Sequence, residues 1–142
     1  MRVVLDNNIV VSALLWGGNP VQILEAAADG RIELYATEPL LSELAGVLPR
    51  PKLADRILKA QRTPNQLIEQ YRGLVEIVSA AEIAPVVVGD PDDDQVLACA
   101  VAAGAELIVT RDKKLRDLKN YQRIPIVDAS EGARIVSNLR VP

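Results

Sequence analysis

The sequence predicts an α/β fold with a central, mostly parallel sheet. Short β-branched runs alternate with longer helical patterns, an order that favours a parallel sheet over segregated strands and helices. Hydrophobic residues make up 49% of the 142 residues and charged residues 25%, the balance of a packed globular protein. No internal repeat or low-complexity linker interrupts the pattern. We therefore expect one domain over residues 1–142.

The N-terminal elements follow from hydrophobic patterning and turn residues. Residues 2–5 (RVVL) predict a buried strand, and residues 9–15 an apolar helix directly after it. The Gly-Gly-Asn-Pro sequence at 17–20 predicts a turn. A second helix is expected over residues 20–29, with Gly30 as its C-terminal stop.

A strand and a helical insertion are expected next. Residues 31–36 (RIELYA) alternate as a strand does. Thr37 is positioned to cap a helix that has Pro39 in its first turn and ends near Leu48. Two further helices, over residues 52–62 and 64–71, form the insertion, and the second has Thr63 as its cap.

The C-terminal half returns to alternating strands and helices. Residues 75–78, 106–109 and 124–127 predict strands. A helix opens in the aspartate cluster near Asp92 and ends at Gly104, and the last helix spans residues 130–139.

The absent residue types narrow the possible chemistry. The chain has no histidine and one cysteine, which excludes His/Cys zinc sites, Ser-His-Asp triads and paired-histidine ribonuclease chemistry. It also lacks the P-loop and GxGxxG sequences. Cys99 lies among alanines, which predicts a small buried side chain in a reducing compartment.

The longest apolar stretch, residues 96–105, is far shorter than the roughly 20 residues that cross a bilayer. With an acid at position 6 before any signal-peptide segment, we expect a cytoplasmic protein without a membrane span.

Several acids are expected at one edge of the predicted sheet. Asp6 directly follows the first strand, and Asp112 follows the 106–109 strand closely. Ligands bind open α/β sheets at this carboxyl edge, where helices also begin. Asp94 lies in the first turn of the helix that starts near Asp92. Glu43 lies at the border of an apolar helical stripe, so its side chain is expected to follow the core boundary.

Each acid also has a purely structural explanation. Asp6 is positioned to cap the following helix, and either Asp92 or Asp93 is expected as an N-cap. Glu43 also fits a surface acid and Asp112 a turn residue. Four carboxylates brought together, however, repel one another unless a cation compensates. A divalent ion resolves that repulsion, and oxygen ligands alone suit Mg²⁺ or Mn²⁺. A calcium EF-hand is excluded because Gln95 and Val101 replace its glycine and glutamate.

The chain resembles the PIN-domain ribonucleases, in particular the small single-domain type found as VapC-like toxins of toxin–antitoxin pairs. The likeness spans nearly the whole chain and rests on VVLDNNIVVSALL (3–15), LLSELAGVL (40–48), DPDDDQVLACAVAAGAELIVTRD (90–112) and IPIVDASE (124–131). It implies a three-layer fold in which helices flank the sheet.

The resemblance also implies a catalytic site. It assigns the acidic metal site to Asp6, Glu43, Asp94 and Asp112, with Asn8 and Thr110 as polar helpers and Asp92 and Asp93 as further support. One departure is Asn7, where the family commonly has Thr. The implied activity is hydrolysis of RNA phosphodiester bonds with one or two Mg²⁺ or Mn²⁺ ions. The implied partners are an RNA substrate, a second copy in a homodimer and an antitoxin protein.

Basic residues suggest how a nucleic acid is held. Although the net charge is −3, most of the basic residues gather in two segments, 50–62 and 111–123. We expect Arg111, Lys113, Lys114 and Arg116 to hold an RNA backbone, whereas the first segment fits solvated helix faces equally well. With four aromatic rings in the chain, recognition is expected to depend on backbone and shape more than on base stacking.

Two other classes of protein remain open from the sequence. One is a phosphoryl-transfer or phosphatase-like domain, which also places aspartates at strand ends, although Asp6 is followed by Asn7 and Asn8 and not by the usual Asp-x-Asp pattern. The other is a non-catalytic RNA-binding domain of the same fold.

Overall fold

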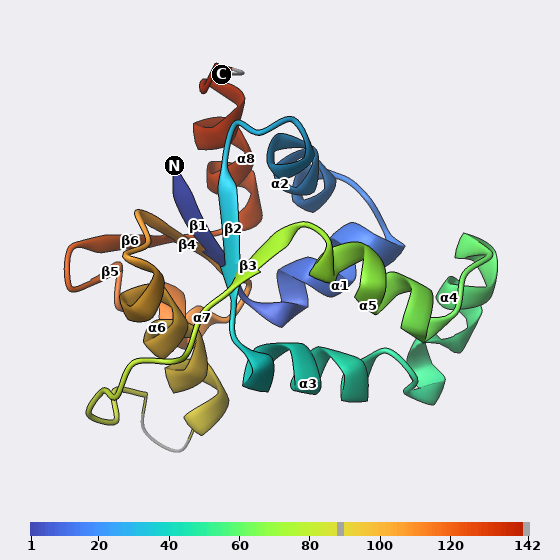
Figure 1. Cartoon of the computed structure of the whole chain (residues 1–142), viewed down its shortest axis with the longest axis horizontal. Coiled ribbons are helices and arrows are strands. Elements are labelled where there is room, and N and C mark those ends of the chain that lie inside the picture. Colours follow the sequence, from blue (N-terminus) through green and yellow to red (C-terminus); the bar gives the residue numbers. More distant parts are fainter. Residues whose placement is uncertain (88–89, 141–142) are drawn as a thin grey trace.

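A mixed sheet forms the centre of the computed structural model, which describes residues 1–87 and 90–140 (Figure 1). Its strand order is β3-β2-β1-β4-β6-β5, and every pairing is parallel except that of β5 with β6. The prediction of a mostly parallel sheet is confirmed. The strands are β1 (Arg2–Leu5), β2 (Glu33–Ala36), β3 (Val75–Ile77), β4 (Leu107–Val109), β5 (Asn120–Tyr121) and β6 (Ile124–Val127).

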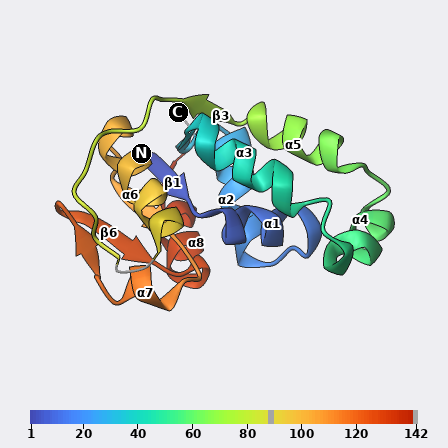
Figure 2. The same cartoon turned by 90° about the horizontal axis from the view of Figure 1, so that it is seen from below.

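Helices flank both faces of the sheet. They are α1 (Asn7–Leu15), α2 (Asn19–Ala28), α3 (Glu38–Val47), α4 (Ala54–Ala60), α5 (Pro64–Arg72), α6 (Pro91–Ala103), α7 (Lys113–Arg116) and α8 (Ala129–Ser137), with a 3₁₀ turn at Pro51–Leu53. Both views place α4 and α5 at one end of the molecule and α6 with α7 at the other (Figures 1 and 2). The helical insertion predicted for residues 52–71 therefore extends away from the sheet.

Successive side chains of β1 point to opposite faces of the sheet and contribute to two separate core layers. Val3 and Leu5 pack with residues of α1, α2 and α8 on one face. Val4 packs on the other face with residues of α6, among them Leu97 and Cys99. Strand β4 and residues 3–5 of β1 are buried on both faces, which is why both are uninterrupted apolar runs. This arrangement is the three-layer architecture that the family resemblance implied.

Local capping signals set most helix starts. The hydroxyl oxygens of Thr37 and Thr63 accept hydrogen bonds from the backbone N–H groups of Leu40 and Gln66, as predicted for N-caps. The expected cap of α6 is wrong: neither Asp92 nor Asp93 but Asp90 holds that position, and its carboxylate accepts from the Asp93 N–H. Pro91 explains the shift, because proline is favoured in the first turn, where its missing N–H costs nothing.

Some short elements were not predicted. Helix α1 begins at Asn7, two residues earlier than expected, and α7 and β5 lie between the predicted 106–109 and 124–127 strands, where no element was predicted. In the described part of the chain, no single helix is long and apolar enough to cross a membrane; α1 and α2 together reach the required length and composition but meet at a 92° bend.

Candidate metal centre

Six carboxylates line one small pocket at the carboxyl edge of the sheet. The pocket has a volume of about 270 Å³ and also contacts Asn7, Asn8, Val11 and Val47. Its acids come from the end of β1, from α3, from the start of α6 and from the start of α7. They are Asp6, Glu43, Asp90, Asp92, Asp93 and Asp112. The fold thus concentrates acids that lie far apart in the sequence.

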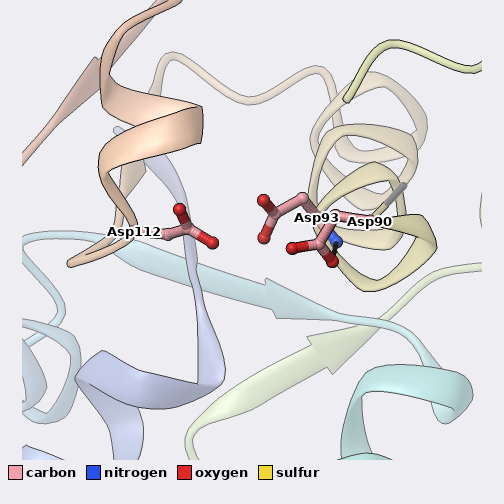
Figure 3. Close-up of side chains that lie close together, drawn as sticks. All are labelled: Asp90, Asp93 and Asp112. Atoms are coloured by element: carbon pink, nitrogen blue, oxygen red, sulfur yellow. Dashed lines mark hydrogen bonds between the residues drawn. The ribbon is translucent and has the colours of Figure 1, made fainter. Parts of the chain in front are cut away.

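Three of these acids approach one another closely. Asp90, Asp93 and Asp112 each offer a carboxylate oxygen within 4.8 Å of the other two, and Figure 3 shows the Asp93 and Asp112 side chains pointing toward each other from α6 and α7. Asp93 is only 5% exposed. Its Oδ2 atom is buried and has no hydrogen-bond partner among the described residues. A buried, unpartnered carboxylate oxygen is unfavourable unless a cation or a proton satisfies it.

A short hydrogen-bond network fixes Asp6. The Thr110 hydroxyl donates to Asp6 Oδ2 at 2.7 Å and accepts from the Asp112 backbone N–H at 3.0 Å. Asn8 Nδ2 lies 3.4 Å from the same Asp6 oxygen. Thr110 is fully buried, directly after β4, and therefore holds the strand-end acids Asp6 and Asp112 in a fixed relation.

Asn7 connects the pocket to α3. Its Nδ2 donates to the Leu40 carbonyl at 2.9 Å and to Glu43 Oε1 at 3.3 Å. The side chain is buried, and the bond to Glu43 turns that carboxylate along the core boundary toward the pocket. Asn7, noted in the sequence only as a departure from the family pattern, is therefore a positioning residue for Glu43.

The crowding raises the pKa of several of these acids. Burial is the main cause for Asp93, whose pKa rises to about 8; the neighbouring Asp112 carboxyl adds to the effect, followed by the charges of Asp90 and Asp6. Burial also raises the pKa of Asp6, against the lowering effect of the Thr110 hydrogen bond. For Glu43 burial again leads, the Asn7 hydrogen bond opposes it, and the charges of Asp92 and Asp6 contribute. A bound cation would reverse these shifts because it favours the ionised forms.

Asp94 does not join the cluster. Its carboxylate accepts hydrogen bonds from the backbone N–H groups of Val86 and Val87 at 3.0–3.3 Å and so anchors the loop before α6. The expectation that Asp94 lies beside Asp6 is wrong, and Asp93 occupies that place instead. On α6, Asp93 is three and four residues before the fully buried Val96 and Leu97, so it lies on the helix face that packs on the sheet. The sequence signal that could have indicated the inward-facing Asp93 was its helical spacing from the apolar Val96 and Leu97. The signal for Asp90 as the helix cap was the proline that follows it.

The ligand set fits a hard divalent cation. Every ionisable group in the pocket is a carboxylate, and asparagine and threonine oxygens lie beside them. Oxygen ligands of this kind suit Mg²⁺ or Mn²⁺ better than softer metals. The unpartnered Oδ2 of Asp93, one of the three clustered acids, is an available ligand atom.

The four basic residues predicted to hold an RNA backbone do not all lie in one place. Arg111 and Arg116 line a larger neighbouring hollow of about 1000 Å³. Lys113 instead pairs with Asp117 at 2.8 Å, and Lys114 Nζ lies 3.8 Å from Asp90 Oδ2 at the rim of the acidic pocket. Lys52 also lines the larger hollow. It belongs to the basic segment 50–62, for which the sequence did not decide between RNA binding and ordinary solvated helix faces.

Comparison with known proteins identifies the family. A family model described as PIN domain matches residues 2–114. No curated protein matches the chain. Among solved structures, the chain resembles one from VapBC2 of Rickettsia felis, crystallised bound to a DNA fragment from its promoter; the identity is 17%, the TM-score 0.58, and the match covers 90% of this chain and 98% of that one. The structural likeness supports the fold, and the family match covers most of the sequence. The chain therefore belongs to the PIN domain family.

Proposed function

We propose that this protein is a metal-dependent endoribonuclease that hydrolyses RNA phosphodiester bonds. The single observation that carries the proposal is the convergence of six carboxylates on one pocket, with a buried, unpartnered oxygen of Asp93 among them. An RNA-binding domain without catalysis does not need so many acids in one place, because their mutual repulsion is unfavourable without a cation. A phosphatase-like domain is disfavoured because Asp6 is followed by Asn7 and Asn8 and not by the usual Asp-x-Asp pattern.

The residues of the pocket fall into binding and positioning roles. The proposed metal ligands are Asp90, Asp93 and Asp112, whose carboxylate oxygens lie close together, joined by Asp6. Glu43 lies at the border of the site. A divalent ion held by these carboxylates would polarise a phosphodiester and lower the pKa of a water molecule. Thr110 and Asn8 orient Asp6 by their hydrogen bonds, and Asn7 orients Glu43.

The biological role is proposed at the level of the family. The name of the similar structure, VapBC2, and the resemblance to VapC-like toxins support a toxin of a toxin–antitoxin pair. RNA as the substrate, Mg²⁺ or Mn²⁺ as the ion, a homodimer, an antitoxin partner and a cytoplasmic location all belong to that proposal. It is also part of the proposal that residues 1–142 act as a single nuclease domain.

The test is cleavage of structured and single-stranded RNAs with Mg²⁺, Mn²⁺ or EDTA by the wild type, Asp6→Ala, Asp93→Asn and Asp94→Asn. We expect metal-dependent cleavage that falls by more than about 100-fold in Asp6→Ala and Asp93→Asn, since replacing even residues that only support metal ligands costs about 10–100-fold. Asp94→Asn is the matched control one position away, and it should stay within a few-fold of the wild type because its carboxylate only anchors a loop.

Two results would contradict the assignment. Equal activity in Asp93→Asn and the wild type, with loss in Asp94→Asn, would restore Asp94 as the ligand. Absence of cleavage in every protein, together with trapping of a phosphorylated aspartate by a small phosphodonor, would favour the phosphoryl-transfer alternative.

A further inference from the structure

Trp16 presents a large aromatic ring at the wall of the larger hollow. It is the only tryptophan of the chain, follows the last residue of α1 and is 51% exposed. The guanidinium carbon of Arg56, on α4, lies 5.0 Å from the ring centroid. A cation over one face of an indole holds the ring by a cation–π contact and leaves the remaining exposed surface for another flat group.

The hollow beside Trp16 continues into the acidic pocket. Asn8, Val11 and Val47 line both. A ligand lying in the hollow therefore extends to the proposed metal centre without leaving the surface. This continuity makes the hollow a path to the site.

Three cationic side chains line the hollow, together with one acid, Asp128, whose carboxylate caps α8 by accepting from the Glu131 N–H. Lys52, Arg111 and Arg116 line it, and none of the three has an ion pair with a carboxylate in the described part of the chain. Arg111 is held in place by a 2.9 Å hydrogen bond to Ser12 Oγ, and the Nε atoms of Arg56 and Arg116 are buried without hydrogen-bond partners. These unmatched cations complement a phosphate backbone.

We propose that the hollow holds a single-stranded segment of the RNA that adjoins the cleaved bond. One base stacks on Trp16, and backbone phosphates contact Lys52, Arg111 and Arg116. The proposal rests on the proposed ribonuclease function and extends it to the surface that binds the strand beside the cleaved bond, with Trp16 as its stacking platform. A single strand is required because bases in a duplex are already stacked on their neighbours and do not present a free face to the indole.

The first experiment follows the fluorescence of Trp16 in EDTA, so that binding is separated from metal-dependent cleavage. Because Trp16 is the only tryptophan, the emission reports on this site alone. We expect a mixed-sequence single-stranded RNA to quench the emission, and a duplex of the same sequence to leave it nearly unchanged. An abasic ribose-phosphate oligomer should bind the basic residues without the quenching.

Two variants separate stacking from folding. Trp16→Leu should bind single-stranded RNA about 5- to 100-fold more weakly, as expected for one lost base stack. Trp16→Phe keeps an aromatic face and should recover most of that affinity. The same ranking is expected for KM in Mg²⁺ with kcat much less affected, and circular dichroism should confirm that both variants are folded.

The salt dependence tests the phosphate contacts. Lys52→Ala should reduce the slope of log affinity against log salt concentration by about 0.7, the value for one phosphate on a single strand. Lys59→Ala is the matched control, because Lys59 is an exposed lysine of the same insertion that does not line the hollow. The slope for Lys59→Ala should equal that of the wild type.

Some outcomes overturn the inference, and one overturns only the nuclease proposal. Unchanged Trp16 emission at saturating RNA, or wild-type KM in Trp16→Leu while cleavage persists, would remove the stacking site and leave the nuclease proposal standing. Quenching by an acidic peptide and not by RNA would make the hollow a protein-docking site and would also overturn it. Quenching by single-stranded RNA without metal-dependent cleavage would support the binding site and overturn the nuclease instead.

Discussion

At the scale of single residues, neighbouring aspartates of α6 have opposite environments. Asp93 faces the other acids of the pocket with an unpartnered buried oxygen, whereas Asp94 receives two backbone N–H donors from the preceding loop. Donors stabilise the ionised carboxylate, and burial beside like charges destabilises it. The chemistry of each acid therefore depends on which side of the helix it occupies and not on its residue type.

The raised pKa of Asp93 predicts a pH-dependent stability for the metal-free protein. An aspartate in the unfolded chain titrates near pH 3.9, whereas in the folded protein the pKa of Asp93 is about 8. Between these values the folded state binds more protons than the unfolded state, so the free energy of unfolding falls as the pH rises. We expect urea unfolding in EDTA to show that the free energy of unfolding falls by about 3–4 kcal/mol from pH 5 to pH 8.

The matched pair for that measurement is Asp93→Asn and Asp55→Asn. The asparagine of Asp93→Asn does not titrate, so most of the fall in the free energy of unfolding between pH 5 and pH 8 should disappear. This variant should also be more stable than the wild type at pH 8. Asp55 is an exposed acid of α4, and its replacement should leave the fall unchanged. Identical pH dependence in the wild type and Asp93→Asn would contradict the role of burial at this position.

At the scale of elements, Asn7 joins the first residue of α1 to α3. It is the only residue of α1 whose side chain is hydrogen-bonded to α3 in the described structure, through the Leu40 carbonyl and Glu43. The contact fixes both the packing of the two helices and the direction of one pocket acid. Stability and activity should therefore respond together when it is removed.

Asn7→Ala should lower the free energy of unfolding by about 1–2 kcal/mol, because a buried hydrogen-bond pair is lost. The bond lowers the pKa of Glu43, so its removal should move the acidic limb of the cleavage–pH profile to higher pH. Thermal unfolding and a cleavage–pH series measure the two effects. Asn65→Ala, at an exposed position in α5, is the control and should change stability by less than about 0.5 kcal/mol. An unshifted acidic limb would show that Asn7 does not position Glu43.

Local signals predicted most of the elements but only part of the pocket. The central strands and the Thr37 and Thr63 caps were predictable because apolar runs and capping residues act within a few positions of the chain. The direction of Asp94 was not, because it depends on a loop folding back onto the start of α6. The short α7 and β5 were missed because they contain too few residues for a periodic pattern.

At the scale of the whole molecule, the acids of the pocket come from elements that are far apart in the sequence. Asp6 follows β1, Asp93 belongs to α6 and Asp112 precedes α7. An ion bound by these three acids would connect elements from both halves of the chain. Binding that occurs in the folded state alone adds to global stability.

Mg²⁺ or Mn²⁺ at about 100 times its dissociation constant should stabilise the wild type by about 2.7 kcal/mol. For a chain of this length the melting temperature should rise by roughly 5–15 °C. The rise should be smaller at pH 5.5 than at pH 8, since the metal has to displace protons from the acids. Differential scanning calorimetry with and without EDTA measures it. Asp93→Asn should lose most of the rise and Asp55→Asn none of it; an equal rise in both would place the ion elsewhere.

The start of α6 also bears on how this chain can change in evolution. In four consecutive positions after the capping Asp90, the residues are a helix-starting proline, an acid near Glu43, a buried acid of the pocket and an acid that anchors a loop. Each added or removed residue turns the following side chains by about 100° around the helix axis. A single deletion there would exchange the environments of these acids while leaving the composition almost unchanged. The length of this stretch is therefore constrained more strictly than its overall composition.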